Sequence, residues 1–594
     1  MGILRRLGSV VGAVGLVASP LAPAAQAQQP VTLRVAIIQQ VDSLNPFLAT
    51  YQASTEVGRL MYDYLTAYDA KDQRPVEGVA KSWEKSADNL TWTFTVPDGK
   101  KWSDGQPITA KDVGFTYNLM MTDKDAATAN GSFVANFESV TVPDDRTVVI
   151  KTKVPQASML ALDVPIVPEH VWKGVGKIAD YKNDVTPSVS SGPFVLSEYR
   201  ANEFIKFKAN KEYWRGAPKY DELHFIYYKT VDAAVQALDK GELDLVNRMG
   251  PAQFDSLKGK SGITLNKAQG RRFNELVLNS GAATKTGEPI GDGHPALKDV
   301  KVRQAIAKAI DQDAIIARVN GGYAERGTGP IPPVFPDYHL TPEKVRPFDP
   351  AAANTELDQA GYPKGSDGIR VGADGKPLKL RLVGHTSRAY DEQAGEYIKS
   401  SLADIGIAVD VQLVADTLLD EQGVAGKFDL IFSGWGTNPD PDFILSLHTC
   451  DSRPESPTTS GTTDTFFCDK TYDELYAKQG AELDPAKRSA LVKQMQQRFY
   501  DEVPAIILGH DNSLEAYRND TFASFTIQPD PGGVIMAQNG MWGYYGAVPV
   551  AAAGAASSGP SGLLIAGIVV VVLLVVGGVL LLARRRGATA GDRE

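Results

Sequence analysis

The stretch 433–442 combines residue types that can hold a ligand without reacting with it. Gly434 and Gly436 flank Trp435 within it. Glycine lets the backbone approach a ligand closely, and an indole supplies a flat apolar wall. The sequence is equally consistent with a Trp435 that is buried in the core and with two glycines that form a turn. On the binding interpretation, we expect the ligand to be lined by Gly434, Trp435, Gly436, Thr437, Asn438 and Asp440.

The sequence contains no pattern that would support catalysis. Its seven histidines are dispersed, and neither Gly-x-Ser-x-Gly nor His-Glu-x-x-His occurs. A hydrolase would need a nucleophile with a base, or a metal with its ligands. We therefore predict that the protein is not an enzyme and has no catalytic residues and no cofactor. A secreted hydrolase is kept as the alternative from another class.

Cys450 and Cys468 are the two cysteines of the chain. Thiol pairs in exported proteins usually oxidise, so we expect one disulfide between them. His448 is close to Cys450, but a metal site would need further ligands nearby. We predict no metal site.

The loop 433–442 follows the last strand of a predicted parallel sheet. Strand patterns at 378–383, 407–414 and 428–432 alternate with a helix pattern at 389–405 and a second, shorter helix. Consecutive βαβ units predict parallel strands with right-handed crossovers. Ligands of such sheets bind just past the carboxyl ends of the strands, which is where this loop begins.

Both ends of the chain carry targeting patterns. Residues 1–27 join a basic start to an apolar run and small residues, the layout of a cleavable secretory signal. Residues 563–583 are apolar and uncharged, which predicts a C-terminal transmembrane helix. Three arginines then place the tail 584–594 in the cytoplasm. With 551–562 as a flexible linker, we expect a single-pass protein of the cell membrane whose N-terminal domain is extracytoplasmic.

Bulk composition limits the domain count and the partners. Removal of both ends leaves roughly 520 residues, too many for one hydrophobic core, so two or more domains are expected. The net charge of -10 and the pI of about 5.4 argue against a nucleic-acid partner.

Several segments of the chain resemble the family 5 extracellular solute-binding proteins, the dipeptide and oligopeptide receptors of bacterial ABC importers. They occur in family order and span nearly all of 31–520. The matching segments are VAKSWEKSADNLTWTFTVPDGKKWSDGQPITAKDVGFTYN (79–118), SGPFVLSEYRANEFIKFKANKEYWRGAPKYDELHF (191–225), KDVKVRQAIAKAIDQDAIIARVNGG (298–322), FDPAAANTELDQAGY (348–362) and FDLIFSGWGTNPDPDFI (428–444).

The resemblance implies a two-lobed α/β fold like that of type II periplasmic binding proteins, with the ligand between the lobes. Lobe one would be 28–282 with an extra subdomain at 79–187, lobe two 283–509, and 510–550 a return to lobe one. The implied function is that of a monomeric receptor that captures small peptides and delivers them to the permease subunits of an ABC importer. The C-terminal helix would add the membrane as a further partner.

The sequence departs from the family at one position. Peptide-binding members place an acid in the loop after the Gly-Trp pair to receive the amino group of the peptide, and the matching residue here is Asn438. An amide carries no charge, and a charge-assisted hydrogen bond is about twice as strong as a neutral one. Asp440 or Asp442 could replace the acid if the loop shifts by two residues. A neutral oligosaccharide or another non-peptide solute is therefore an alternative ligand.

Overall fold

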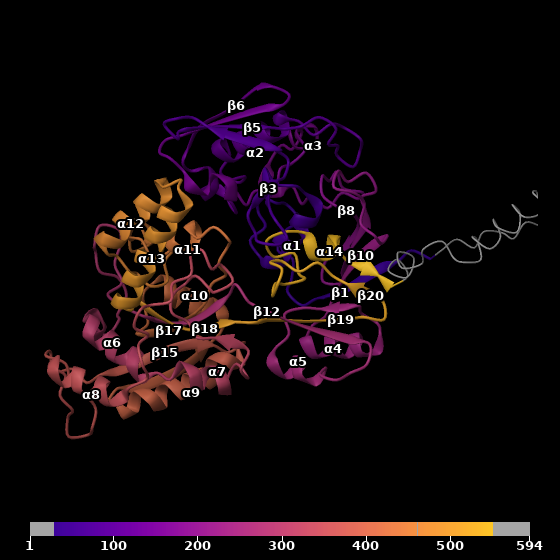
Figure 1. Cartoon of the computed structure of the whole chain (residues 1–594). Helices are drawn as coiled ribbons and strands as arrows, with labels where there is room; N and C mark the ends of the chain where they lie inside the picture. Colours follow the sequence, from indigo (N-terminus) through magenta and orange to yellow (C-terminus); the bar gives the residue numbers. More distant parts are fainter. Residues whose placement is uncertain (1–28, 460, 551–594) are drawn as a thin grey trace, which may run out of the picture.

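Two large β-sheets organise the computed structural model, which describes residues 29–459 and 461–550. One sheet has seven strands in the order β12-β19-β11-β1-β10-β9-β8, and the other has six in the order β14-β18-β13-β17-β15-β16. We call the part built around the seven-stranded sheet the first lobe and the part built around the six-stranded sheet the second lobe. The two lobes lie next to each other (Figure 1). This arrangement agrees with the two-lobed α/β fold predicted from the sequence.

The first lobe alternates buried and less buried residues along its strands. In β1, Leu33 and Val35 are fully buried, and β1 pairs in parallel with β10. Helices α4 and α5 lie over β11 and β19 of this sheet. The strands of the sheet are β1 (Thr32–Ile37), β8 (Phe194–Arg200), β9 (Phe204–Ala209), β10 (Glu222–Tyr227), β11 (Leu245–Val246), β12 (Ile263–Ala268) and β19 (Ser513–Arg518). Its helices are α1 (Gln52–Met61), α4 (Val231–Lys240), α5 (Pro251–Ser256) and α14 (Trp542–Tyr545).

A four-stranded sheet, of order β4-β5-β7-β6, extends the first lobe at the top of Figure 1. Its strands and helices are β4 (Ser82–Lys85), β5 (Thr91–Thr95), β6 (Phe137–Asp144), β7 (Thr147–Thr152), α2 (Ala110–Thr122) and α3 (Glu169–Trp172). Thr109 and Asp112 form a capping box at the start of α2, the arrangement that a Thr-x-x-Asp sequence favours. Trp92 and Phe94 share one hydrophobic core with Leu33, so the sheet packs onto the first lobe.

Short elements complete the first lobe. Two strand pairs, β2 with β3 and β20 with β21, lie outside the larger sheets. The bounds are β2 (Thr66–Tyr68), β3 (Pro75–Glu77), β20 (Phe522–Ser524), β21 (Val548–Pro549) and the 3-10 turns η1 (Gly131–Val134), η2 (Ala157–Ala161) and η3 (Ile178–Asp180).

The second lobe confirms the βαβ order predicted from the sequence. β15 pairs in parallel with both β16 and β17, and α9 and α10 connect them in turn. The strands are β13 (Phe273–Leu278), β14 (Ala324–Glu325), β15 (Lys379–His385), β16 (Ala408–Val414), β17 (Leu430–Ser433) and β18 (Ala505–Asp511). The helices are α6 (Val300–Ala309), α7 (Gln312–Arg318), α8 (Pro350–Gln359), α9 (Ala389–Asp404), α10 (Asp416–Val424), α11 (Asp442–Ser446), α12 (Lys470–Ala481) and α13 (Pro485–Glu502), with 3-10 turns η4 (Pro295–Lys298) and η5 (Cys450–Ser452).

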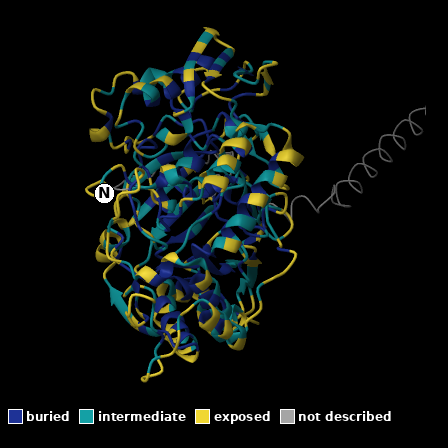
Figure 2. Cartoon of the chain, turned by 90° about the vertical axis from the view of Figure 1, so that its left-hand side faces the viewer, coloured by how far each residue is buried: buried dark blue, intermediate teal, exposed yellow. Residues whose placement is uncertain are grey.

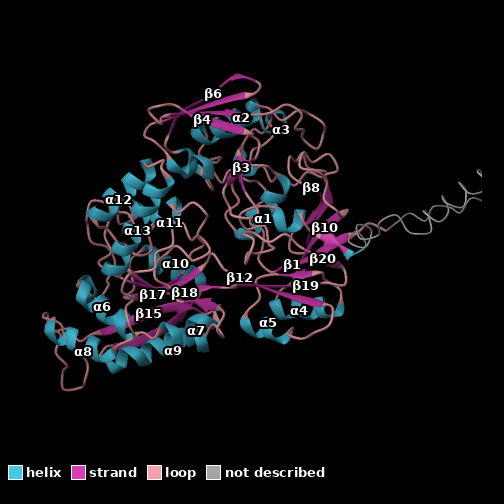
Figure 3. Cartoon of the chain, viewed as in Figure 1, coloured by secondary structure: helices cyan, strands magenta, loops and turns pink. Residues whose placement is uncertain are grey.

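The six-stranded sheet is mixed: β15, β16 and β17 are parallel, whereas β13 pairs antiparallel with β17 and β18. Both of its faces are covered, as its parallel strands require. Leu380 and Leu382 of β15 pack with α6, α8 and α9 on one face, whereas Val383 packs with α10 to α13 on the other. Figure 3 shows these two helix layers on opposite sides of β15 and β17. Exposed residues lie mainly on the outer surfaces of the helices and loops, around buried strands (Figure 2).

Two adjacent segments connect the lobes. The chain passes from β12 to β13 through 269–272 and returns from β18 to β19 at Asn512. Because β12 pairs with β19 and β13 pairs with β18, the two connections run side by side. A Cβ atom on Gly270 would lie 1.7 Å from the carbonyl oxygen of Asp511, so only glycine fits there. The predicted boundaries at 282/283 and 509/510 stay a prediction.

The predicted transmembrane helix and the single-pass membrane localisation are withdrawn. Within 29–459 and 461–550, no helix is long and apolar enough to cross a membrane. The longest, α13, has 18 residues and carries charges such as Arg488 and Arg498, whereas a span needs about 20 mainly apolar residues. The segments 1–27, 551–562, 563–583 and 584–594, to which the signal, linker, span and tail were assigned, lie outside the described residues.

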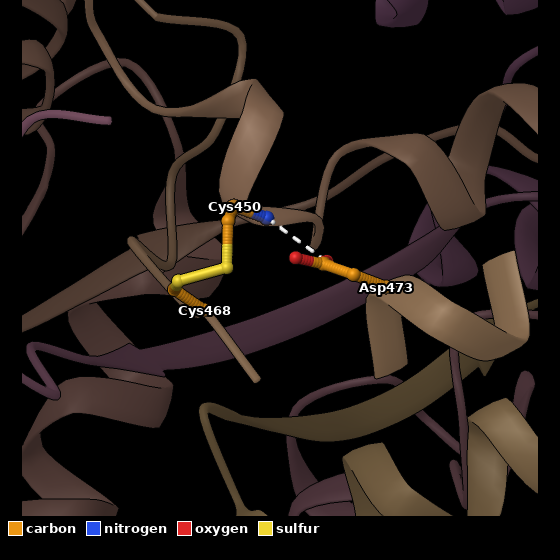
Figure 4. Close-up of side chains that lie close together, drawn as sticks. All are labelled: Cys450, Cys468 and Asp473. Carbon is orange, nitrogen blue, oxygen red and sulfur yellow. Dashed lines mark hydrogen bonds between the residues drawn. A yellow bond between two sulfur atoms is a disulfide. The ribbon is translucent and has the colours of Figure 1, made fainter. Parts of the chain in front are cut away.

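The predicted disulfide between Cys450 and Cys468 is present. It closes the segment between α11 and α12, and the backbone N–H of Cys450 donates to Oδ1 of Asp473 over 3.1 Å (Figure 4). The ligand atoms of these three residues lie within 4.8 Å of one another. Oxidation removes both thiolates, so this group does not offer the ligands that a metal ion needs.

We expect the double substitution Cys450→Ser and Cys468→Ser to destabilise the protein by about 3 kcal/mol, because the bridge restricts the unfolded chain over a separation of 18 residues. Urea unfolding with and without a reductant measures the effect. Reduced wild type should match the variant, and an identical midpoint for oxidised and reduced wild type would contradict the prediction.

Candidate functional site

A cavity of about 670 Å³ lies between the two lobes. This volume is in the range of small-molecule binding sites, which is about 300–1,000 Å³. The first lobe contributes residues from α1, β2, the segment 132–163 and the return segment before α14. The second lobe contributes the loop after β17, α11 and α12. The polar and charged residues of its wall include Arg59, Asp163, Asn438, Asp440, Asp442 and Asn539.

The loop 433–442 reaches this cavity because it pairs with the segment that connects the lobes. The N–H of Phe273 donates to the carbonyl of Trp435 over 3.0 Å, and the N–H of Thr437 donates to the carbonyl of Arg271 over 2.9 Å. A Cβ on Gly434 would lie 2.4 Å from the carbonyl oxygen of Phe273. Gly434 is therefore needed for this pairing, whatever it contributes to a ligand.

Trp435 is half-buried and fixed by polar and apolar contacts. Its Nε1 donates to Oδ2 of Asp464 over 2.8 Å, and its ring lies edge-on to Phe443 with 6.2 Å between centroids. Phe443 lines the cavity, whereas Trp435 is not among the lining residues. The indole thus supports the cavity wall from behind Phe443.

The structure therefore divides the six predicted ligand-binding residues. Asn438 and Asp440 line the cavity, whereas Gly434, Trp435, Gly436 and Thr437 do not. Thr437 is fully buried, and its hydroxyl donates to the carbonyl of Pro330 over 2.8 Å. The role of all six in binding stays a prediction.

Two carboxylates of the cavity wall are each neutralised by an arginine of the same lobe. Arg59 donates from both terminal nitrogens to Asp163, over 2.7 and 2.6 Å, within the first lobe. Arg488 binds Asp440 in the same two-bond manner, over 2.6 and 2.9 Å, within the second lobe. Because Arg488 already neutralises Asp440, this carboxylate is a poor substitute for the amine-binding acid.

Asp442 is the carboxylate of the wall that has no Lys or Arg within 4.0 Å in the described part of the chain. Its Oδ1 accepts from Nε2 of Gln479 over 2.8 Å. Burial and then the nearby charge of Asp440 raise the pKa of Asp442. A cationic group of a ligand would relieve both effects, so Asp442 is the better candidate for an ammonium.

Asn438 is bound to an arginine. Nη1 of Arg271 donates to Oδ1 of Asn438 over 2.7 Å and to Oδ1 of Asn539 over 3.0 Å. Removal from water and then the charge of Arg59 lower the pKa of Arg271 to about 9, which leaves it charged at neutral pH. The guanidinium thus joins the loop after β17 to the return segment of the first lobe.

A buried acidic pair lies beneath Trp435. Glu275 of β13 is fully buried, and neither of its carboxyl oxygens has a hydrogen-bond partner among the described residues. Oδ2 of Asp464 accepts from Ser433 over 2.6 Å as well as from Trp435. Burial and then the charge of Asp464 raise the pKa of Glu275 well above its ordinary value. The folded chain therefore favours the neutral, protonated form of Glu275.

Sequence reasoning missed most of the polar and charged groups in and beside the cavity wall. These groups come from distant parts of the chain and follow no motif: Arg59, Asp163 and Asn539 in the wall, and Arg271 and Arg488 beside it. The one signal that could have been used is the consecutive pair Arg271-Arg272 between two strand patterns, since such a junction must lie where the lobes meet.

Comparison with known proteins identifies similar sequences and folds. The sequence model described as "Bacterial extracellular solute-binding proteins, family 5 Middle" matches residues 74–454. A putative ABC transporter peptide-binding protein of Brucella ovis is 31% identical over 395 residues, which cover 64% of this chain and 69% of the relative. The dipeptide-binding protein of Escherichia coli is 27% identical over 558 residues, covering 89% and 97%.

A solved structure shows the same fold. The oligopeptide-binding protein AppA of Bacillus subtilis, in complex with a nonapeptide, superposes with a TM-score of 0.69 at 22% identity. The match covers 87% of this chain and 99% of that chain.

The buried acidic pair generates a prediction about stability and pH. The folded pKa of Glu275 lies above its ordinary value of 4.5, so the folded chain keeps a proton that the unfolded chain releases. The protonated Glu275 therefore contributes its full stability to the folded state below the ordinary pKa of 4.5. This contribution is lost as the pH rises through the folded pKa. We expect the stability of Glu275→Gln relative to wild type to increase as the pH rises from 4.5 through the folded pKa of Glu275.

Urea midpoints of both proteins across this pH range test the prediction, with the exposed Glu343→Gln as control. Parallel stability curves for wild type and Glu275→Gln would show that Glu275 does not hold the proton.

Proposed function

The chain belongs to family 5 of the bacterial extracellular solute-binding proteins, and we propose that it is the receptor that captures small peptides and delivers them to the permease of an ABC importer. Relatives in this family carry the names of peptide-binding and dipeptide-binding proteins. Such proteins are substrate-binding receptors.

The observation that carries the proposal is the cavity between the lobes. Its wall comes from both lobes, and its volume of about 670 Å³ suits a ligand of a few residues. A ligand that contacts both walls stabilises the closed arrangement by its differential affinity for it. The adjacent connections at 269–272 and Asn512 supply the hinge in this proposal, with lobes at 28–282 and 283–509 and the return segment at 510–550.

Asp442 supports peptides as the ligand class. A free peptide carries an ammonium group, and Asp442 offers it a carboxylate without a cationic partner in the described part of the chain. Hydrogen bonds to charged groups contribute about 1.5–3 kcal/mol, enough to orient a short peptide. The disulfide between Cys450 and Cys468 fits an oxidising, extracytoplasmic compartment.

Small peptides should raise the unfolding temperature of the purified protein. Ligand binding to the folded state alone adds about 2.7 kcal/mol when the free ligand is at about 100 times its Kd. Thermal unfolding with pools of di- to tetrapeptides, and with neutral oligosaccharides as the comparison, measures this. Stabilisation by oligosaccharides and by none of the peptide pools would refute peptide capture.

Asp442→Asn should weaken the binding of peptides with a free amino group by roughly tenfold or more, because a charge-assisted hydrogen bond is lost. Since the pKa of Asp442 is raised, wild-type affinity for these peptides should also fall as the pH drops through that pKa and the carboxylate gains a proton. Calorimetric titration with free and N-acetylated peptides measures both effects.

Asp410→Asn, at an exposed position of β16, is the matched control. Equal loss of affinity for free and N-acetylated peptides in Asp442→Asn would argue that Asp442 shapes the cavity and does not bind the amine.

A further inference from the structure

Arg271 carries a positive charge that has no carboxylate in direct contact among the described residues. The other arginines nearby are paired: Arg59 with Asp163, Arg488 with Asp440, and Arg248 with Glu56 over 2.8 Å. In the described ranges 29–459 and 461–550, no carboxylate oxygen lies within 4.0 Å of Arg271. Its hydrogen-bond partners are two amide oxygens, and its buried Nε has no acceptor.

The contact with Arg271 fixes the orientation of the Asn438 amide. A guanidinium group offers donors only, so the amide must direct its oxygen toward Arg271. The amide nitrogen of Asn438 then makes no hydrogen bond within the described residues, whereas that of Asn539 donates to Oε1 of Gln73 over 3.2 Å. Since Asn438 lines the cavity, it presents N–H donors to a ligand.

The charge of Arg271 and the free amide nitrogen of Asn438 favour a negatively charged ligand group at position 438, whereas the family pattern predicts a positively charged one. An ammonium group donates hydrogen bonds and is positively charged, so it cannot pair with the Asn438 nitrogen and is repelled by Arg271. A carboxylate accepts hydrogen bonds and carries the opposite charge. It would satisfy the free amide nitrogen and compensate Arg271 together.

Arg272 adds a second positive charge on the same side of the loop. It also lacks a carboxylate partner within 4.0 Å in the described part of the chain. The two guanidinium groups approach each other at Gly436, where a Cβ atom would lie 3.7 Å from Nη1 of Arg272 and 3.8 Å from Nε of Arg271. A side chain at Gly436 would therefore contact both guanidinium groups.

We propose that Asn438, which lines the cavity, and Arg271, which binds the Asn438 amide but does not itself line the cavity, form a subsite that attracts and binds a carboxylate of the ligand, so that the receptor selects solutes that carry this group. The inference rests on the proposed function, and it adds that the ligand carries a carboxylate group. The carboxylate can be the C-terminus of a peptide or an acidic side chain, and these two sources share the same chemistry.

The substitution Asn438→Asp gives opposite results under the two interpretations of this position. A carboxylate at 438 would lie at the 2.7 Å contact with Arg271 and compensate its charge, so binding of a ligand carboxylate should weaken. If Asn438 instead stood in for an amine-binding acid, the same substitution should strengthen the binding of peptides with a free amino group.

The test uses three pools of tri- and tetrapeptides built from Ala, Val, Leu and Ser: unmodified, N-acetylated, and C-terminally amidated. Thermal unfolding and calorimetry are measured on wild type, Arg271→Gln, Arg271→Lys and Asn438→Asp. Arg200→Gln, at an exposed position of β8, controls for the loss of one positive charge. Urea unfolding of each variant verifies that it folds.

We expect the amidated pool to bind wild type roughly tenfold or more weakly than the pools with a free carboxylate. Arg271→Gln should abolish this difference, Arg271→Lys should retain part of it, and Asn438→Asp should weaken binding of the free-carboxylate pools. An amidated pool with an added Asp or Glu residue then separates the sources, since restored binding assigns the subsite to an acidic side chain.

Equal affinity of wild type for free and amidated pools would overturn the carboxylate subsite while leaving peptide capture intact. A preference for the carboxylate that survives in Arg271→Gln would overturn it as well. If no pool binds, peptide capture fails, and mass spectrometry of the molecule that co-purifies with the protein decides the inference. A carboxylate in that molecule supports it, and a neutral or purely cationic molecule refutes it.

Discussion

The backbone pairing between Arg271–Phe273 and Trp435–Thr437 is the contact on which the site depends. Two hydrogen bonds, of 3.0 and 2.9 Å, hold the loop after β17 against the segment that connects the lobes. They place Trp435 over Asp464, Thr437 against Pro330 and Asn438 within reach of Arg271. Because the pairing uses main-chain atoms, the residues that face the cavity can change while the loop keeps its position.

Charge compensation then decides what the cavity can bind. Asp163 and Asp440 each have an arginine, so they present little net charge to a ligand. Asp442 and Arg271 lack such partners in the described residues. A ligand with one positive and one negative group would compensate the charges of both. A buried or half-buried charge is costly until it is paired, which gives the bound state a specific electrostatic gain.

Features set by local sequence could be predicted, and features set by distant contacts could not. The βαβ order of 377–433, the capping box at Thr109 and the disulfide follow from periodicity and residue type. Asn438 was found through its position after a strand, but its partner Arg271 is 167 residues away, and no periodicity links them. The orientation of the Trp435 indole could not be predicted either, because it is set by a hydrogen bond to the distant Asp464. The span at 563–583 was assigned from composition alone, and these residues lie outside the described part of the chain.

The ion pairs of the described residues all lie within one lobe or the other. Arg59–Asp163 and Arg248–Glu56 belong to the first lobe, and Arg488–Asp440 and Arg381–Asp429 belong to the second. Separation of the lobes therefore breaks none of these pairs. Dissolved salt screens attraction between opposite charges over about 10 Å at an ionic strength of 0.1 M. Among the described residues no direct ion pair joins the two lobes, so a change in external salinity removes no such pair from their junction.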